Sequence, residues 1–117
     1  MKTADVIDAL GALAHPYRLA IYRLLVEQGP GGLSAGVIAE RIGLVPSSLN
    51  FHLQSLQRAG LIGQVRSSRQ IIYSADYSVM NDLVGYLTDK CCSAGGGICA
   101  TSCEPATPKI TRRKKVA

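Results

Sequence analysis

The sequence predicts a mainly α-helical fold, a winged helix-turn-helix with a two-stranded β wing. Two short helical segments, 34–44 and 46–58, follow each other with only a tight turn between them. In the second segment, Leu49, Leu53 and Leu56 recur at helical spacing and form one apolar stripe. The stretch that follows carries β-branched and aromatic residues on both sides of a polar turn, which is typical of a β-hairpin.

The N-terminal part of the chain predicts two helices before the helix-turn-helix. The first runs from Thr3 to Ala14, and the second runs roughly from Pro16 to Gln28. The second is apolar nearly all round, so we expect it to be the central core helix. His15 is a metal ligand or pH sensor in one interpretation and a helix-start residue beside a proline in the other, which we favour. The first helix carries its apolar residues near one side: Val6, Ile7, Leu10 and Leu13.

The predicted helix-turn-helix has clear end signals and one polar face. Ser34 is a suitable N-cap for its first helix, Gly43 ends that helix, and Gly60 ends the second. The outer face of the second helix lacks carboxylates and holds Ser, Asn and Gln, which pair with base edges and phosphates. We therefore predict a recognition helix for double-stranded DNA. Its DNA-binding residues are Ser47, Ser48, Asn50, Phe51, His52 and Gln54.

Two residues of this set each allow two interpretations. Phe51 is the only Phe of the chain and projects from the polar face, where it either contacts a thymine methyl group or packs beneath the wing. His52 lies beside the apolar stripe, where it either meets DNA or forms a hydrogen bond inside the domain. The sequence leaves both choices open.

The predicted wing contains a short basic turn. Val65 precedes the run 66-RSSR-69, and strand-forming residues follow it. We expect the hairpin to carry Arg66 and Arg69 to the phosphate backbone. The alternative is a hairpin that only covers the core, with both arginines in solvent.

A last helix is predicted to start after Asp76, a good N-cap, and to end near Lys90. Together with the first helix, it is expected to form a two-fold homodimer interface, since two copies would read two related half-sites. The alternative is that both helices only complete a monomer core. Its wide apolar stripe consists of Val79, Met80, Leu83, Val84 and Leu87.

Charge is distributed unevenly along the chain. Residues 105–117 hold five of the 13 basic residues and no acidic residue, so the remaining part has as many basic as acidic residues. We expect three parts: a DNA-binding and dimerisation domain at 1–90, a cysteine-rich inducer-binding segment at 91–104, and a disordered basic tail at 105–117. No apolar run is long enough to cross a membrane, and no secretion signal is evident, so we expect a cytoplasmic protein without a membrane partner.

The four cysteines lie close together, and the chain has the character of a cytosolic protein rather than a small secreted scaffold. Clustered cytosolic cysteines favour reduced metal ligands or redox switches over disulfides. An enzyme with a cysteine nucleophile is not expected, because such a thiolate needs a structured anion-binding loop. The cysteines are Cys91, Cys92, Cys99 and Cys103.

The ordered segments resemble the ArsR-type (arsenical-resistance) family of metalloregulatory repressors over about residues 4–90. The segments that carry the resemblance are 15-HPYRLAIYRLL-25, 47-SSLNFHLQSLQRAGLI-62, the 66-RSSR-69 wing and the final helix. The resemblance implies a winged-helix homodimer that leaves its operator DNA when a metal or metalloid binds. The implied repressor requires no cofactor for DNA binding.

Two sensor sites of this family are absent here. The first helix of the helix-turn-helix has no cysteine, and the last helix has no His, with Ser78 in a ligand position beside Asp76. The remaining thiols look like those of arsenic-sensing members, with Cys91, Cys92 and Cys99 as ligands and Cys103 as an optional fourth. The resemblance thus implies As(III) as inducer, with Sb(III) or methylated arsenicals as further candidates. A sensor of another soft metal, or a two-thiolate sensor of methylated trivalent arsenicals, is the alternative function.

Overall fold

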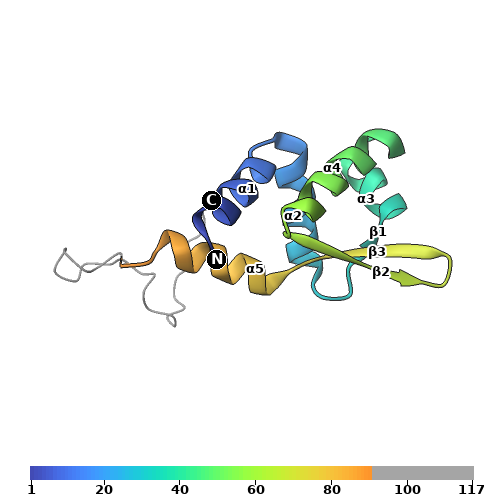
Figure 1. Cartoon of the computed structure of the whole chain (residues 1–117). Helices are drawn as coiled ribbons and strands as arrows, with labels where there is room; N and C mark the ends of the chain where they lie inside the picture. The colour runs from blue at the N-terminus through green and yellow to red at the C-terminus, as the bar shows by residue number, and fades with distance from the viewer. Residues whose placement is uncertain (91–117) are drawn as a thin grey trace, which may run out of the picture. The chain divides into compact units, whose positions relative to one another are not determined.

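The computed structural model describes residues 1–90; the expected cysteine-rich segment and basic tail lie outside these described residues. The described elements belong to one packed unit, Met1–Leu87. In chain order they are α1 (Thr3–Leu13), α2 (Pro16–Gln28), β1 (Leu33–Ser34), α3 (Ala35–Ile42), α4 (Pro46–Arg58), β2 (Ile62–Ser67), β3 (Gln70–Ala75) and α5 (Tyr77–Leu87) (Figure 1).

Local signals fix the helix ends close to the predicted positions. The backbone N–H of Tyr17 donates to Nδ1 of His15, which makes His15 the N-cap of α2 and confirms the helix-start interpretation. The Ser34 hydroxyl accepts a hydrogen bond from the N–H of Val37 at the start of α3. Gly43 ends α3 with φ of 84°, a left-handed conformation that favours glycine.

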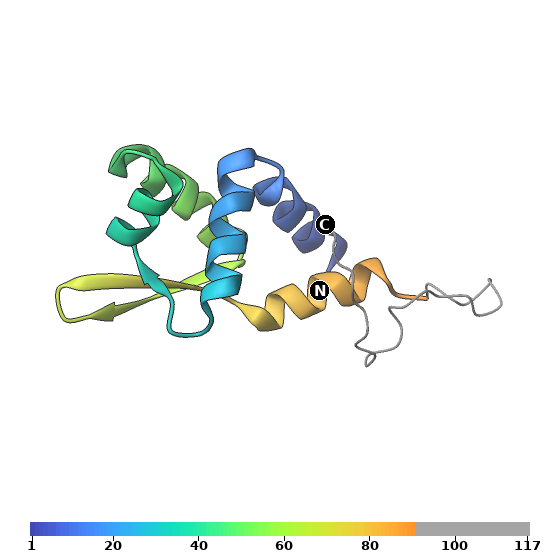
Figure 2. The ribbon, with the colours of Figure 1, turned by 180° about the vertical axis from the view of Figure 1, so that it is seen from behind.

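Helix α2 is the central helix of the unit and packs against α1, α3, α4 and β3. Figure 2 shows it standing between α1 and the α3–α4 pair. Its residues Ile21 and Leu25 are fully buried, but Tyr17 and Leu19 are nearly half exposed. The prediction of a central core helix is therefore confirmed, while α2 is not enclosed on all sides as its composition suggested.

The sheet contains one more strand than the predicted two-stranded wing. β2 and β3 pair antiparallel from Ile62↔Ala75 to Ser67↔Gln70. β1 adds a third antiparallel strand on the other side of β3, with Leu33 opposite Tyr73. The sequence could not reveal β1, because two residues carry no strand pattern and their pairing depends on the tertiary fold.

A close backbone approach explains the glycine before β1. Gly32 has φ of 71°, and a Cβ at this position would lie 2.8 Å from Cγ2 of Ile72 and would overlap the carbonyl oxygen of Tyr73. Both the positive φ and the lack of space require glycine. Gly32 therefore lets the chain reach β3 at close range.

The last helix begins as predicted but ends earlier. Oδ1 of Asp76 accepts hydrogen bonds from the backbone N–H groups of Ser78 and Val79, which confirms Asp76 as the N-cap. The helix ends at Leu87 rather than near Lys90. Its side chains divide between core and surface, since Leu83 is buried whereas Leu87 is exposed.

Candidate nucleic-acid interface

The recognition helix α4 separates an apolar inner face from a polar outer face. Leu49, Leu53 and Leu56 are buried in the core. Their burial fixes the rotation of the helix about its axis, so the residues on the opposite face of the helix point away from the core. Of the predicted DNA-binding residues on α4, Ser47, Asn50, Phe51 and Gln54 are exposed, Ser48 is half-buried and His52 is buried.

His52 takes the second of its two predicted roles, a hydrogen bond inside the domain. Only 8% of His52 is exposed, and its Nδ1 accepts a hydrogen bond of 3.2 Å from Nε of Arg18. The imidazole rings of His15 and His52 lie 4.6 Å apart between centroids. Burial, followed by the nearby His15 and Arg18, lowers the pKa of His52 from 6.5, which favours the neutral ring.

Phe51 lies on the surface beside these residues. Phe51 is 59% exposed, so it does not pack beneath the wing. The guanidinium carbon of Arg18 lies 5.6 Å from the ring centroid, within the range of a cation–π contact. Phe51 also meets His52 edge to face, with centroids 5.6 Å apart. Phe51 and His52, two neighbouring residues of α4, thus both contact Arg18 of α2.

The wing places both predicted arginines in solvent. Arg66 lies on β2 opposite Ile71, and Arg69 lies in the two-residue turn that follows. Residues 63–70 are all exposed, so this part of the hairpin does not cover the core. The α3–α4 pair and the tip of the hairpin lie toward one end of the unit, while α1 and α5 lie toward the other, in both views (Figures 1 and 2).

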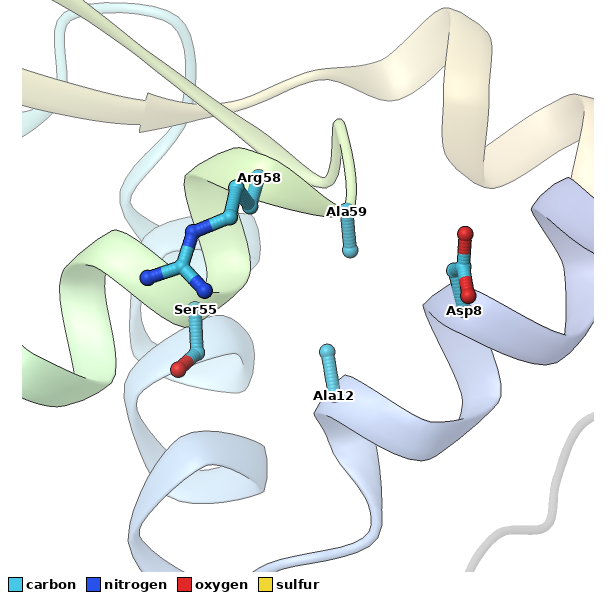
Figure 3. Close-up of a pocket in the computed structure, with 5 residues that line it drawn as sticks. All are labelled: Asp8, Ala12, Ser55, Arg58 and Ala59. Carbon is cyan, nitrogen blue, oxygen red and sulfur yellow. The ribbon is translucent and has the colours of Figure 1, made fainter.

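A hollow of about 290 Å³ separates the C-terminal end of α4 from α1. Asp8 and Ala12 line it from α1, and Ser55, Arg58 and Ala59 line it from α4 and its end (Figure 3). The Arg58 side chain runs along α4 and does not extend across to Asp8. These residues include no thiol or imidazole, so this hollow provides no ligand that a soft metal prefers.

The predicted inducer site lies outside the described part of the chain, because Cys91, Cys92, Cys99 and Cys103 all follow residue 90. Within residues 1–90, no three His, Cys, Asp or Glu residues gather closely enough to hold a metal ion. Oδ1 of Asp76, which the resemblance places at a second sensor position, caps α5 and also accepts a hydrogen bond from the Ser78 hydroxyl. None of the helices in this part has both the length and the apolarity needed to cross a membrane.

Arg18 was not connected with the surface of α4 in the sequence analysis. It belongs to the first turn of α2, whose pattern indicates only a core helix. Nothing in the spacing of Arg18 connects it to Phe51 or His52, more than thirty residues later in the chain. The sequence contains one indirect signal. The outer face of α4 has no basic residue before Arg58, so a cation beside this helix has to come from another element.

Comparison with known proteins places this architecture in a family. Residues 13–65 match a family model described as a helix-turn-helix domain. The HTH-type transcriptional regulator YgaV of Escherichia coli (strain K12) is 34% identical over 83 residues, which cover 71% of this chain and 82% of YgaV. The nodulation protein NolR of Rhizobium meliloti is 32% identical over 80 residues, 68% of this chain but only 63% of NolR.

The structural comparison agrees with the sequence matches. An ArsR-like transcriptional regulator from Rhodococcus sp. RHA1 superposes with a TM-score of 0.63 at 30% identity, covering 72% of this chain and 76% of that protein. The match to the family model, residues 13–65, includes the helix-turn-helix, and the described elements form a winged helix. The chain therefore belongs to the ArsR family of helix-turn-helix transcriptional regulators, which are DNA-binding proteins rather than enzymes.

Proposed function

We propose that this protein is an As(III)-responsive repressor that binds operator DNA as a homodimer and dissociates when trivalent arsenic binds Cys91, Cys92 and Cys99. The position of these thiols in the chain carries the proposal. Cys91 follows Leu87, the last residue of α5, after only three residues. An inducer bound there would act directly on the end of that helix.

Arsenite chemistry suits this ligand set. As(III) is soft and prefers thiolates. Three cysteine thiols replace the three hydroxyl groups of As(OH)₃ and release three molecules of water, so the arsenic ends with three sulfur ligands and its lone pair. Cys103 is an optional fourth thiol that this geometry does not require.

The proposed DNA contacts divide between base edges and phosphates. Exposed polar residues of α4 would enter the major groove, where serine and the amides of Asn50 and Gln54 can hydrogen-bond to base edges. Arg66 and Arg69 of the wing would contact the phosphate backbone. His52 is buried and would support this surface through Arg18 rather than read DNA itself. The base-reading set is Ser47, Ser48, Asn50 and Gln54, with Phe51 beside it.

The apolar surfaces of α1 and α5 support a homodimer. Ile7 of α1 is 62% exposed and Leu87 of α5 is 57% exposed, and Leu10 and Tyr86 add further exposed apolar area. The two helices are joined by a hydrogen bond of 2.8 Å between the Thr3 and Tyr86 hydroxyls. Exposed apolar residues on two packed helices are typical of an interaction site, and a second copy of α1 and α5 would cover them.

This arrangement gives the inducer a route to the DNA. If α5 takes part in the dimer interface, its position influences the separation of the two recognition helices. These helices must meet half-sites about one DNA turn apart, so a small reorientation lowers affinity. Linkage then requires that DNA weaken arsenite binding by the same factor by which arsenite weakens DNA binding.

The alternative is a sensor of another soft metal or metalloid, or of methylated trivalent arsenicals held by two thiolates. In either case the reduced thiols fit a cytoplasmic location, where disulfides are rare. We assign sensing to residues 91–104 and non-specific DNA affinity to the basic residues of 105–117. Sb(III) shares the thiol preference of As(III) and belongs in the same test.

The test is a titration of a labelled DNA duplex, selected by the parent protein from a random-sequence pool, with arsenite, antimonite and a methylated trivalent arsenical. We expect arsenite to weaken DNA binding by roughly 5- to 150-fold, the usual range of allosteric coupling. Cys91→Ser, Cys92→Ser and Cys99→Ser should each bind the duplex normally and lose most of the release. Fluorescence anisotropy at fixed salt provides both measurements.

Cys103→Ser is the matched control, since it removes a neighbouring thiol that the proposed site does not need. It should respond to arsenite like the parent. Release of Cys99→Ser at the parental arsenite concentration would reject the three-thiolate site and favour the two-thiolate alternative. Release of all three variants by arsenite would reject sensing by these cysteines.

A further inference from the structure

The recognition helix has little positive charge of its own. From Pro46 to Gln57 the sequence contains no Lys and no Arg, and the first basic residue is Arg58 in the last turn of α4. DNA affinity depends strongly on the neutralisation of phosphates by Lys and Arg. A cation beside the middle of this helix must therefore come from another element.

Arg18 is held in that place by two residues of α4. Its Nε donates to Nδ1 of His52 over 3.2 Å, and its guanidinium carbon lies 5.6 Å from the centroid of the Phe51 ring. Arg18 is half-buried, whereas Phe51 is 59% exposed on the outer face. The guanidinium thus lies where α2 meets the polar surface of α4. Its Nη1 and Nη2 nitrogens each carry two further N–H donors suited to phosphate oxygens.

His52 also contacts two other aromatic rings. The ring of His15 lies 4.6 Å from that of His52, and Tyr17 lies 5.9 Å from it. Because Nδ1 of His52 accepts the bond from Arg18, the neutral ring carries its proton on Nε2. A mobile charged side chain loses conformational entropy when it binds a ligand. The contacts of Arg18 with His52 and Phe51 reduce that loss, because they already restrict its side chain.

We propose that Arg18 is a DNA-binding residue that contacts the phosphate backbone next to the recognition helix, with Phe51 and His52 as its positioning residues. The proposal rests on DNA binding through α4 but not on arsenite sensing. A purely structural role, in which Arg18 only joins α2 to α4, is the competing explanation. The two differ in salt dependence, because only a phosphate contact releases counterions when DNA binds.

The central experiment compares Arg18→Gln with Arg23→Gln in the full-length protein without arsenite. Arg23 is the matched control because it is an exposed arginine of the same helix, paired with Glu27 at 3.8 Å. Affinities for the selected duplex and for a random-sequence duplex are measured from 50 to 200 mM salt. Arg18→Gln should flatten the plot of log K against log salt by about 0.9 for each bound protomer. It should weaken both duplexes roughly tenfold, while Arg23→Gln retains the parental slope.

Three further variants separate a phosphate contact from a folding defect. Arg18→Lys retains the charge and should keep most of the salt slope, even though it loses the planar guanidinium. Phe51→Leu alone should weaken both duplexes, because the platform for Arg18 is lost. The double variant Arg18→Gln/Phe51→Leu should bind no more weakly than Arg18→Gln, since Phe51 acts through Arg18.

The results that would overturn the proposal are equally specific. If Arg18→Gln keeps the parental slope of log K against log salt, Arg18 does not contact phosphate and has only a structural role. If the double variant loses the product of the two single losses, Phe51 acts on DNA independently and is not a platform. None of these measurements contains arsenite, so a failure of arsenite sensing would leave their outcome unchanged, and a failure here would not affect the proposed inducer site.

Discussion

Arg18 and His52 are far apart in the chain and meet because α2 packs against α4. At the scale of single residues, the hydrogen bond between Arg18 and His52 depends on the protonation state of His52. Nδ1 of His52 is an acceptor only while the ring is neutral, because the protonated ring has donors on both nitrogens. The same protonation would place a second positive charge beside Arg18. The site is therefore built for an uncharged His52.

The lowered pKa of His52 predicts that acid destabilises the fold. The folded protein holds the proton less tightly than the unfolded chain, so stability from this group is complete above about pH 6.5 and falls as the pH drops below it. His52→Asn keeps an acceptor near the position of Nδ1 and does not titrate. Its loss of stability between pH 7.5 and pH 5.5, measured by urea unfolding, should be smaller than that of the parent. Equal losses in the two proteins would show that His52 does not contribute to the acid sensitivity.

At the scale of secondary structure, α4 and the wing present different chemistry at the proposed DNA interface. α4 offers uncharged hydrogen-bonding groups on a rigid helix whose apolar stripe is buried. The wing offers two arginines on a hairpin whose outer half is exposed. Uncharged amides suit the reading of base edges, and arginines suit phosphates that are the same at every sequence.

Gln54→Ala and Arg69→Ala should therefore have different effects on DNA binding. Gln54→Ala should relax the preference at one base pair by about 1–3 kcal/mol if its contact is bidentate. Arg69→Ala should weaken all duplexes alike and flatten the salt dependence by about one counterion per protomer. Competition binding with a set of single-base variants of the selected duplex measures both effects. An unchanged base preference in Gln54→Ala would remove this residue from the base-reading set.

At the scale of the whole molecule, the two proposed interfaces lie at different ends of the described unit. The helix-turn-helix and the wing tip lie at one end, and α1 with α5 lies at the other (Figure 1). Leu83, part of the apolar stripe expected in the dimer interface, is only 6% exposed and belongs to the core of a single copy. Exposed apolar residues such as Ile7 and Leu87 form the surface that we propose for a second copy.

This division predicts which substitution separates the protomers. Ile7→Asp places a charge on the exposed apolar face of α1 and should yield a folded monomer, because burial of an unpaired carboxylate in the dimer is costly. Sedimentation velocity at micromolar concentration measures the change.

Leu83→Ala is the control for this prediction. It opens a cavity in the core and should reduce the free energy of unfolding by about 2–5 kcal/mol. A dimeric Ile7→Asp protein would show that the face of α1 is not the interface.

The sequence alone determined the order of the helices, the helix ends at Ser34, Gly43 and Asp76, and the two faces of α4. These features depend on residues within a few positions of each other, whose spacing and capping are visible along the chain. Only the tertiary structure decided the strand β1, the burial of Leu83 and the meeting of Arg18 with Phe51 and His52. Each of these depends on segments that are distant in the chain, and their contacts arise from packing rather than from local pattern.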